Sequence, residues 1–266
     1  MFKHMEHRQT ALIRNVGKWG NSAGILLPKE WLGNQVKIVL IDRTLEIKKE
    51  VLSILDSYLE DIIGVYLTGN YARGEQEEDS DIDVIAISKS TKKELISGRY
   101  HISITTLEGI KKTLSHYPEL VIPRLREAKV ILNPHLLEEL TKYPITKKSF
   151  KNFLEDTKRI IKMNAEFIEL DNLDSEELES KAVIYSMVLR LRGIFLIKCA
   201  LENKKYSKED FKRWILQSLD KEEFEKTYDL YKSVRDNKNT KIKIKLQTAR
   251  KLKDFLIKEI KYLETK

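Results

Sequence analysis

The segment from Gly64 to Ile87 constrains this chain more than any other, because it places charged residues between two apolar runs. The first run ends at Leu67 and leads into Thr68-Gly69-Asn70, hereafter the glycine turn. Ten residues separate Asn70 from Asp81, and Asp81 and Asp83, hereafter the acidic pair, begin the second run. Each run has the length and the β-branched composition of a buried strand. The segment therefore predicts two core strands that carry a glycine turn and an acidic pair between them.

The acidic pair indicates a cation. Residues two apart on a strand project from the same face, so the carboxylates of Asp81 and Asp83 lie together. Such carboxylates repel each other and are costly to bury unless a cation offsets their charge. Mg²⁺ or Mn²⁺ suits these oxygen ligands, and Mg²⁺ also retains waters and substrate phosphates. A glycine turn lets backbone approach a phosphate closely. We therefore predict a metal and phosphate site; the alternative is two surface aspartates beside an ordinary turn.

These residues resemble the signature of the DNA polymerase beta superfamily of nucleotidyltransferases, in which a glycine turn precedes D-x-D on the next strand. The similarity is to minimal and kanamycin-type members and covers about residues 53 to 133. It implies a nucleoside triphosphate substrate, with ATP the first choice. It also implies that Asp81 and Asp83 hold the metal and carry catalysis, and that the nucleotide contacts Thr68, Gly69, Asn70 and Arg73.

Two departures from that signature bear on activity. Asn70 stands where serine is usual, and its amide can still donate a hydrogen bond to phosphate. The family also carries a third carboxylate on a later strand, whereas the matching run from Tyr100 to Thr105 has no acid. His101 or Glu108 could replace it as a base, although a lone strand histidine is more often structural and Glu108 more often starts a helix. Without a base, the domain would bind nucleotide and metal but not turn over.

The N-terminal run Lys18-Trp19-Gly20-Asn21-Ser22, followed by Pro28-Lys29-Glu30-Trp31, resembles AbrB-like swapped-hairpin proteins, in their archaeal transposon-associated form. The similarity covers about residues 10 to 48. It implies a homodimer of interleaved hairpins with a basic surface toward DNA, where side chains would contact phosphates rather than read bases. The alternative is a module that only dimerises, since so short a segment has little core of its own. The candidate DNA contacts are Arg14, Lys18, Asn21 and Lys29.

The remaining pattern predicts an α+β chain in three parts. Residues 1–50 form the small β N-terminal swapped-hairpin module, with short strands at 25–27, 36–41 and 44–48 and a one-turn helix at 28–32. Residues 51–140 form the mixed-sheet nucleotidyltransferase domain, with helical spacing at 52–62, 107–114 and 121–127 and strands at 63–67, 82–87, 100–105 and 130–132. Residues 146–266 form a helical bundle, with helices at 149–170, 175–202, 208–217 and 221–235, and a lead-in at 241–246 to a last helix.

Two sets of polar residues in the bundle have two interpretations each. Arg190 and Arg192 flank an apolar stripe, and they either contact a nucleotide phosphate or an acceptor across a cleft, or make surface salt bridges. Tyr228, Tyr231 and Arg235 share one helix face, and they line the same cleft or simply pack.

Composition limits the setting and the partners of the chain. Its 266 residues carry a formal net charge of +8, which suits nucleic acid or nucleotides but also an ordinary solvated surface. Its one cysteine cannot form an internal disulfide, which favours the reducing cytoplasm. No apolar run is long enough for a membrane span.

Three functional hypotheses follow. The first is a Mg²⁺-dependent nucleotidyltransferase that moves a nucleoside monophosphate to an unknown hydroxyl. The second is a dimeric DNA-binding regulator whose nucleotide-binding domain is catalytically impaired. The third is an antitoxin-like modifier that nucleotidylates a partner protein.

Overall fold

The computed structural model describes residues 12, 14, 17–38, 44–77, 80–173 and 176–265. The chain separates into two compact units, Met1–Ile41 and Asp42–Lys266, which we take one at a time.

The described residues of the first unit include a short hairpin. Strand β1 (Gly17–Trp19) pairs antiparallel with β2 (Ser22–Gly24), and Gly20 takes the left-handed conformation in the turn between them. The expected one-turn helix is present as the 3₁₀ helix η1 (Lys29–Trp31) after Pro28. The strand predictions at 25–27 and 36–38 are wrong, because no strand in the described part of this unit forms backbone hydrogen bonds with these residues. The rest of the predicted strand at 36–41, residues 39–41, lies outside the described residues.

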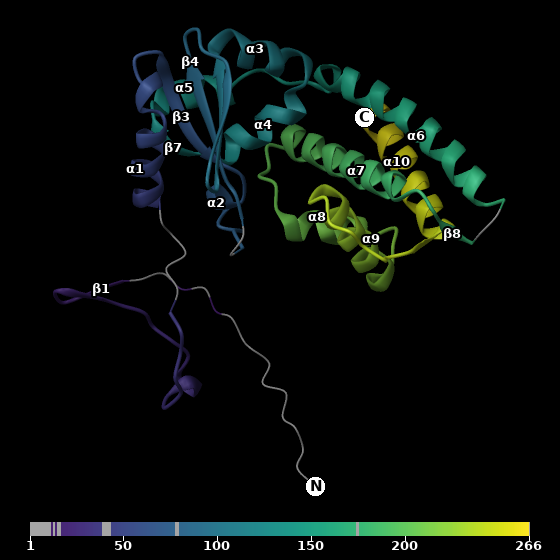
Figure 1. Cartoon of the computed structure of the whole chain (residues 1–266), viewed down its shortest axis with the longest axis horizontal. Coiled ribbons are helices and arrows are strands. Elements are labelled where there is room, and N and C mark those ends of the chain that lie inside the picture. Colours follow the sequence, from purple (N-terminus) through teal and green to yellow (C-terminus); the bar gives the residue numbers. More distant parts are fainter. Residues whose placement is uncertain are drawn as a thin grey trace. The chain divides into compact units, whose positions relative to one another are not determined.

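The second unit is built on a five-stranded mixed sheet (Figure 1). The strand order is β5-β6-β4-β3-β7, with β4 and β6 parallel and the other neighbours antiparallel. The predicted strands at 63–67, 82–87, 100–105 and 130–132 are all present, whereas the edge strand β5 was not predicted, since its alternation is mostly polar. The bounds are β3 (Ile62–Thr68), β4 (Ile82–Ser88), β5 (Lys93–Ser97), β6 (Tyr100–Thr106) and β7 (Lys129–Leu132).

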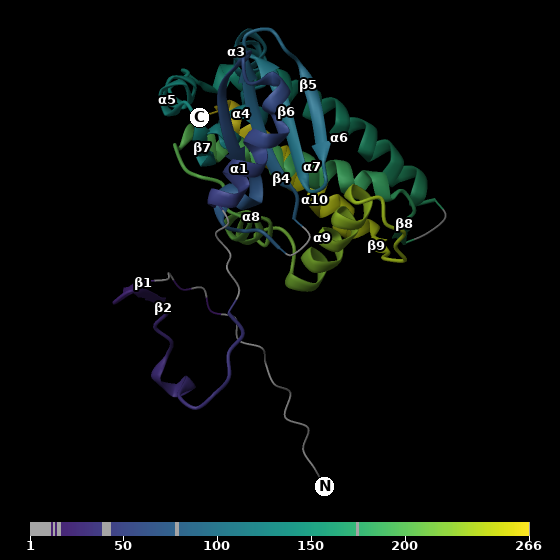
Figure 2. The ribbon, with the colours of Figure 1, turned by 60° about the vertical axis from the view of Figure 1, so that its left-hand side comes forward.

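One face of the sheet is covered by α1 (Thr44–Ile54), which lies over the strands in Figure 2. Its residues Ile47 and Val51, with Leu55 after it, recur at intervals of four and pack on Val65, Val84 and neighbouring side chains. The prediction of a strand at 44–48 is therefore wrong, because this run continues the helical spacing that follows it. The 3₁₀ helix η2 (Asp56–Tyr58) then leads into β3.

The other face of the sheet meets the remaining helices. On β4, Ile85 and Ile87 point to this side, so Asp81 and Asp83 share it. The predicted helices at 107–114 and 121–127 cover this face, whereas the short helices at 69–73 and 134–141 were not predicted. The bounds are α2 (Gly69–Arg73), α3 (Leu107–His116), α4 (Pro118–Glu127) and α5 (Pro134–Thr141).

The C-terminal part is a helical bundle whose core is continuous with this face of the sheet. The helix predicted at 175–202 begins only at Lys181, because Glu177–Leu178 (β8) pairs with Ile244–Lys245 (β9). The run 241–246 leads into the last helix as predicted, although Ile244–Lys245 within it forms β9, and the Ser207 side chain caps α8 by accepting from the Asp210 N–H. The bounds are η3 (Lys147–Phe150), α6 (Lys151–Asp171), α7 (Lys181–Leu201), α8 (Lys208–Ile215), α9 (Lys221–Arg235) and α10 (Leu246–Thr265). Within the described residues, no helix combines the length and apolar character that a membrane span requires.

Candidate active site

The glycine turn lies against the acidic pair. Thr68, at the end of β3, is opposite Asp83 on β4, and the Thr68 hydroxyl donates to the Asp83 backbone carbonyl at 3.3 Å. Gly69 follows with a φ of 71°, in the left-handed region. A Cβ at Gly69 would come within 2.4 Å of the Asp83 carboxylate. Glycine is required on both counts, so the two motifs that the sequence separates by ten residues are in direct contact.

The two carboxylates of the pair have different surroundings. The Asp83 side chain is half-buried, while that of Asp81 is 60% exposed. Burial raises the pKa of Asp83, an effect that the positive charges of Arg124 and His101 oppose and the charge of Asp81 reinforces. A cation beside Asp83 would favour its ionised form for the same reason.

The donor set fits Mg²⁺. The carboxylates of Asp83 on β4 and of Asp81 just before it share one face, and Mg²⁺ needs only one or two carboxylates when waters and phosphates complete its coordination. In the described part of the chain, no group of three or more His, Cys, Asp or Glu residues could hold a metal ion by itself. The acidic pair would thus share the ion with substrate.

Arg73, on the short helix after the glycine turn, holds that turn in place. Its Nε donates to Glu75 at 2.7 Å, its Nη1 to Glu127 at 2.7 Å, and its Nη2 to the side-chain oxygen of Asn70. The Asn70 side chain is exposed, and this contact uses its oxygen, so its amide nitrogen keeps the donor role that the sequence predicts. Arg73 therefore contacts the glycine turn directly at Asn70 and, through Glu127, at Gly69.

Glu127 is a buried carboxylate that sequence reasoning did not single out. It ends α4, and its side chain is 4% exposed. Its Oε1 accepts both the Gly69 backbone N–H, at 3.1 Å, and the Arg73 guanidinium. Burial raises the pKa of Glu127, although hydrogen bonds from Arg73 and Gly69 act in the opposite direction. In the sequence it looks like any charged residue in the last turn of a helix, so no local signal marks it.

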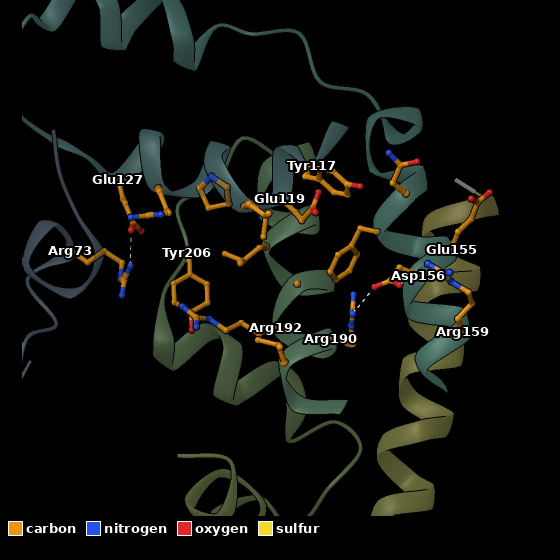
Figure 3. Close-up of a pocket in the computed structure, with 18 residues that line it drawn as sticks. Arg73, Tyr117, Glu119, Glu127, Glu155, Asp156, Arg159, Arg190, Arg192 and Tyr206 are labelled. Atoms are coloured by element: carbon orange, nitrogen blue, oxygen red, sulfur yellow. Dashed lines mark hydrogen bonds and ion pairs between the residues drawn. The ribbon is translucent and has the colours of Figure 1, made fainter. Parts of the chain in front are cut away.

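A cavity of about 1090 Å³ opens from the residues around the turn into the bundle (Figure 3). Arg73, Arg124 and Glu127 form one end of it, and helices α6 and α7 contribute the far walls. Arg124 also reaches the Thr68 hydroxyl at 3.4 Å. The cavity therefore begins where the glycine turn is held.

The two arginines of α7 that line this cavity differ. Arg190 forms an ion pair with Asp156 at 2.6 Å, in agreement with the salt-bridge alternative that the sequence left open for it. The Arg192 guanidinium lies 5.5 Å from the centre of the Tyr206 ring, which also faces Arg73 at 5.2 Å. Among the described residues Arg192 has no carboxylate partner within ion-pair distance, and its Nε is buried without a hydrogen bond. Arg192 thus presents positive charge to the cavity.

Glu119, on α4, lies deep in the cavity wall (Figure 3). The residue is 4% exposed, and its Oε2 has no hydrogen-bond partner. Burial raises its pKa to about 7.

The other candidates from the sequence lie outside the cavity. His101 is opposite Asp83 on β6, with its Nε2 3.9 Å from an Asp81 oxygen, and Glu108 is exposed in the first turn of α3. Tyr231 packs on Tyr185 and Tyr228, and Arg235 pairs with Asp236.

The candidates for DNA contact belong to the first unit. Arg14, Asn21 and Lys29 are exposed there. Lys18 lies in β1, with its side chain outside the described residues.

Comparison with known proteins gives two family matches. Residues 6–44 match the family described as "Putative transposon-encoded protein (DUF2080)". Residues 47–170 match the family described as "Nucleotidyltransferase domain".

Among solved structures, spectinomycin adenyltransferase AAD(9) from Enterococcus faecialis aligns over 82% of this chain and 100% of its own, with 15% identity and a TM-score of 0.49. A nucleotidyltransferase-like protein from Exiguobacterium sibiricum 255-15 aligns over 81% of this chain and 75% of its own, with 12% identity and a TM-score of 0.38.

A curated relative agrees with the second family match. The "Putative protein adenylyltransferase MJ1305" of Methanocaldococcus jannaschii is 35% identical over 127 residues, which are 43% of this chain and 86% of the relative. Through this relative and the match at residues 47–170, the chain belongs to the family of proteins with a nucleotidyltransferase domain.

Proposed function

We propose that this chain transfers a nucleoside monophosphate from a nucleoside triphosphate to a hydroxyl group, with Mg²⁺ or Mn²⁺ bound at Asp81 and Asp83. The observation that carries the proposal is the contact between Gly69 and the Asp83 carboxylate, since it joins a phosphate-binding turn to a metal-binding pair. ATP is the substrate that we favour, because the relative from M. jannaschii is named for adenylyl transfer.

The triphosphate would lie along the glycine turn. Asn70 has an amide nitrogen to donate, and Arg124, which donates to the buried Thr68 hydroxyl, adds positive charge beside the turn. Arg192 brings a positive charge from the bundle that no carboxylate among the described residues neutralises. A buried guanidinium without a counter-ion is costly, and an anionic ligand would offset that cost. A bound Mg²⁺ would supply further neutralisation of phosphate charge.

The acceptor hydroxyl would approach from the cavity. The cavity starts at Arg124 and Glu127, next to the glycine turn, and extends between α4, α6 and α7. An acceptor held there could meet the α-phosphorus, and the reaction would depend mainly on positioning and charge.

The first test is nucleotide binding. We expect ATP with Mg²⁺ to raise the melting temperature of the wild-type chain, and the double variant D81N/D83N to lose that shift. No shift with any of several triphosphates would contradict the proposal. Incubation with α-labelled ATP and cell lysate then tests transfer, with a labelled product that depends on Asp83 as the expected result.

We also propose that the first unit dimerises the chain and contacts DNA. None of its described side chains is buried, and Trp19, Leu26, Leu32 and Ile38 are each more than 60% exposed. So many exposed apolar groups in so short a unit favour a partner copy that covers them. Such a dimer also accommodates the regulator hypothesis, in which nucleotide binding modulates DNA binding.

Mass measurement by light scattering tests the dimer, with residues 45–266 as the comparison. A monomeric full-length chain would contradict it. Gel-shift assays at two salt concentrations test DNA binding: Lys29→Gln should weaken it and reduce its salt dependence. No DNA binding by the wild type would argue that the unit only dimerises, and equal binding by wild type and variant would exclude Lys29 as a contact.

A further inference from the structure

The proposed reaction needs a group to take the proton of the acceptor, and β6 carries no carboxylate for it. Four carboxylates line the cavity: Glu119, Glu127, Glu155 and Asp156. Of these, Glu127 contacts the glycine turn. We propose that Glu127 is the general base that accepts the proton of the acceptor hydroxyl; this assignment rests on the proposed function.

The carboxylate of Glu127 is anchored by one oxygen only. Both the Gly69 N–H and the Arg73 guanidinium donate to Oε1. Neither contact uses Oε2, and the residue lines the cavity (Figure 3). A base must keep a fixed orientation and still present a free acceptor atom to its substrate. Glu127 meets both conditions, since one oxygen fixes the group and the other remains for the acceptor.

The electrostatics agree with this geometry. The side chain is 4% exposed, and burial raises the pKa of Glu127, which makes its carboxylate a better proton acceptor than an exposed one. The positive charges of Arg73 and Arg124 oppose this effect. The same two cations act on Asp83. Glu127 and Asp83 thus both experience the positive charge of these two arginines.

The acceptor hydroxyl gives its proton to Oε2 of Glu127 while its oxygen forms a bond to the α-phosphorus of the triphosphate. The bond from that phosphorus to the bridging oxygen breaks, and pyrophosphate leaves with the electron pair. Glu127 then releases the proton to solvent.

The other candidate bases are placed less well. His101 is 44% exposed on β6, close to Asp81, and does not line the cavity. Glu108 is exposed on α3. Glu119 lines the cavity but has no contact with the glycine turn or its partners among the described residues.

The test uses the full chain with α-labelled ATP and Mg²⁺, and measures pyrophosphate release, with water and with the acceptors of a cell lysate, beside the ATP-induced melting shift. Glu127→Gln keeps an oxygen for Gly69 and Arg73 but cannot take a proton. We expect it to lower the release rate by about 10²- to 10⁴-fold, with the melting shift retained. We also expect the wild-type rate to rise with pH through one ionisation that E127Q lacks.

The matched control is Glu75→Gln, which removes the other carboxylate bound to Arg73 and leaves the cavity unchanged. We expect it to lower the rate by less than about tenfold, a bound below the usual contribution of a general base. An equal loss in E75Q and E127Q, or a loss of the melting shift in E127Q, would mean that Glu127 only positions the turn. A wild-type rate in E127Q, or the large loss in His101→Gln instead, would overturn the assignment. A wild type that neither binds ATP nor releases pyrophosphate would refute the proposed function itself, and this assignment with it.

Discussion

The buried carboxyl of Glu119 should make the stability of this protein depend on pH. Burial raises its pKa from 4.5 to about 7. The folded chain therefore holds this proton to higher pH than the unfolded chain, so stability falls as pH rises from about 4.5 and levels off above about 7. Glu119→Gln replaces the carboxyl with a group of nearly the same shape that does not ionise.

The magnitude follows from linkage between the two pKa values. The ionisation of Glu119 destabilises the fold by about 0.8 kcal/mol at pH 5 and by about 3.4 kcal/mol at pH 8.5, so the difference is about 2.6 kcal/mol. The glutamine amide has a cost of its own. Oε2 of Glu119 has no hydrogen-bond partner, so an amide N–H placed there would also be buried and unpaired. That cost is the same at both pH values and cancels in the difference.

The assay compares urea or thermal unfolding of wild type and E119Q at pH 5 and pH 8.5. The melting temperature of E119Q minus that of the wild type should be higher at pH 8.5 than at pH 5, by roughly 5–10 °C for a chain of this size. Glu155→Gln, on the same cavity but 58% exposed, is the control, since water solvates its charge in both states. If E119Q changed stability equally at both pH values, the reasoning from burial would be refuted.

Other predictions concern glycines and arginines of the site. Gly69→Ala should destabilise the fold by about 1–3 kcal/mol and abolish the ATP-induced melting shift, whereas Gly74→Ala, with a similar φ of 74° but open space around it, should keep that shift; a Gly69→Ala chain that responds normally to ATP would contradict this. Gly193→Ala places a Cβ 2.2 Å from the Phe153 ring and should cost about 1–3 kcal/mol in urea unfolding, with no loss as the contrary result. Arg192→Gln should weaken ATP binding, by calorimetry, more than Arg190→Gln, because Asp156 already neutralises Arg190; equal losses would argue against a phosphate role for Arg192.

The sequence predicts the centre of the site because its signals are local. A glycine that must adopt a positive φ, two acids at strand spacing and two apolar runs are each visible within a few residues, and the structure places them in contact. The mixed sheet and the bundle follow from periodicity in the same way. The strand prediction at 44–48 fails because the run is too short for its period to be distinguished from that of α1.

The cavity and Glu127 could not be predicted because they depend on contacts between distant residues. Glu127 acquires its role from Gly69 and Arg73, more than 50 positions earlier. Arg190 and Arg192 look alike in the sequence, and they differ because Asp156 of α6 faces one of them and Tyr206 faces the other. The short strand Glu177–Leu178 likewise exists only because Ile244–Lys245 folds back on it. Such tertiary partners leave no local trace.

The two ends of the cavity are lined by different parts of the fold, with the last turn of α4 at the end near the glycine turn. That turn contributes Arg124 and Glu127 beside the glycine turn, and the Arg126 guanidinium donates to the Ala200 carbonyl of α7 at 2.7 Å. The walls farther from the turn come from α6 and α7, which take no part in holding the glycine turn or the acidic pair. Substitutions in those helices, Arg192 apart, could therefore change which acceptor fits without disturbing the phosphate end. This arrangement would allow acceptor preference to diverge among relatives that keep the same glycine turn and acidic pair.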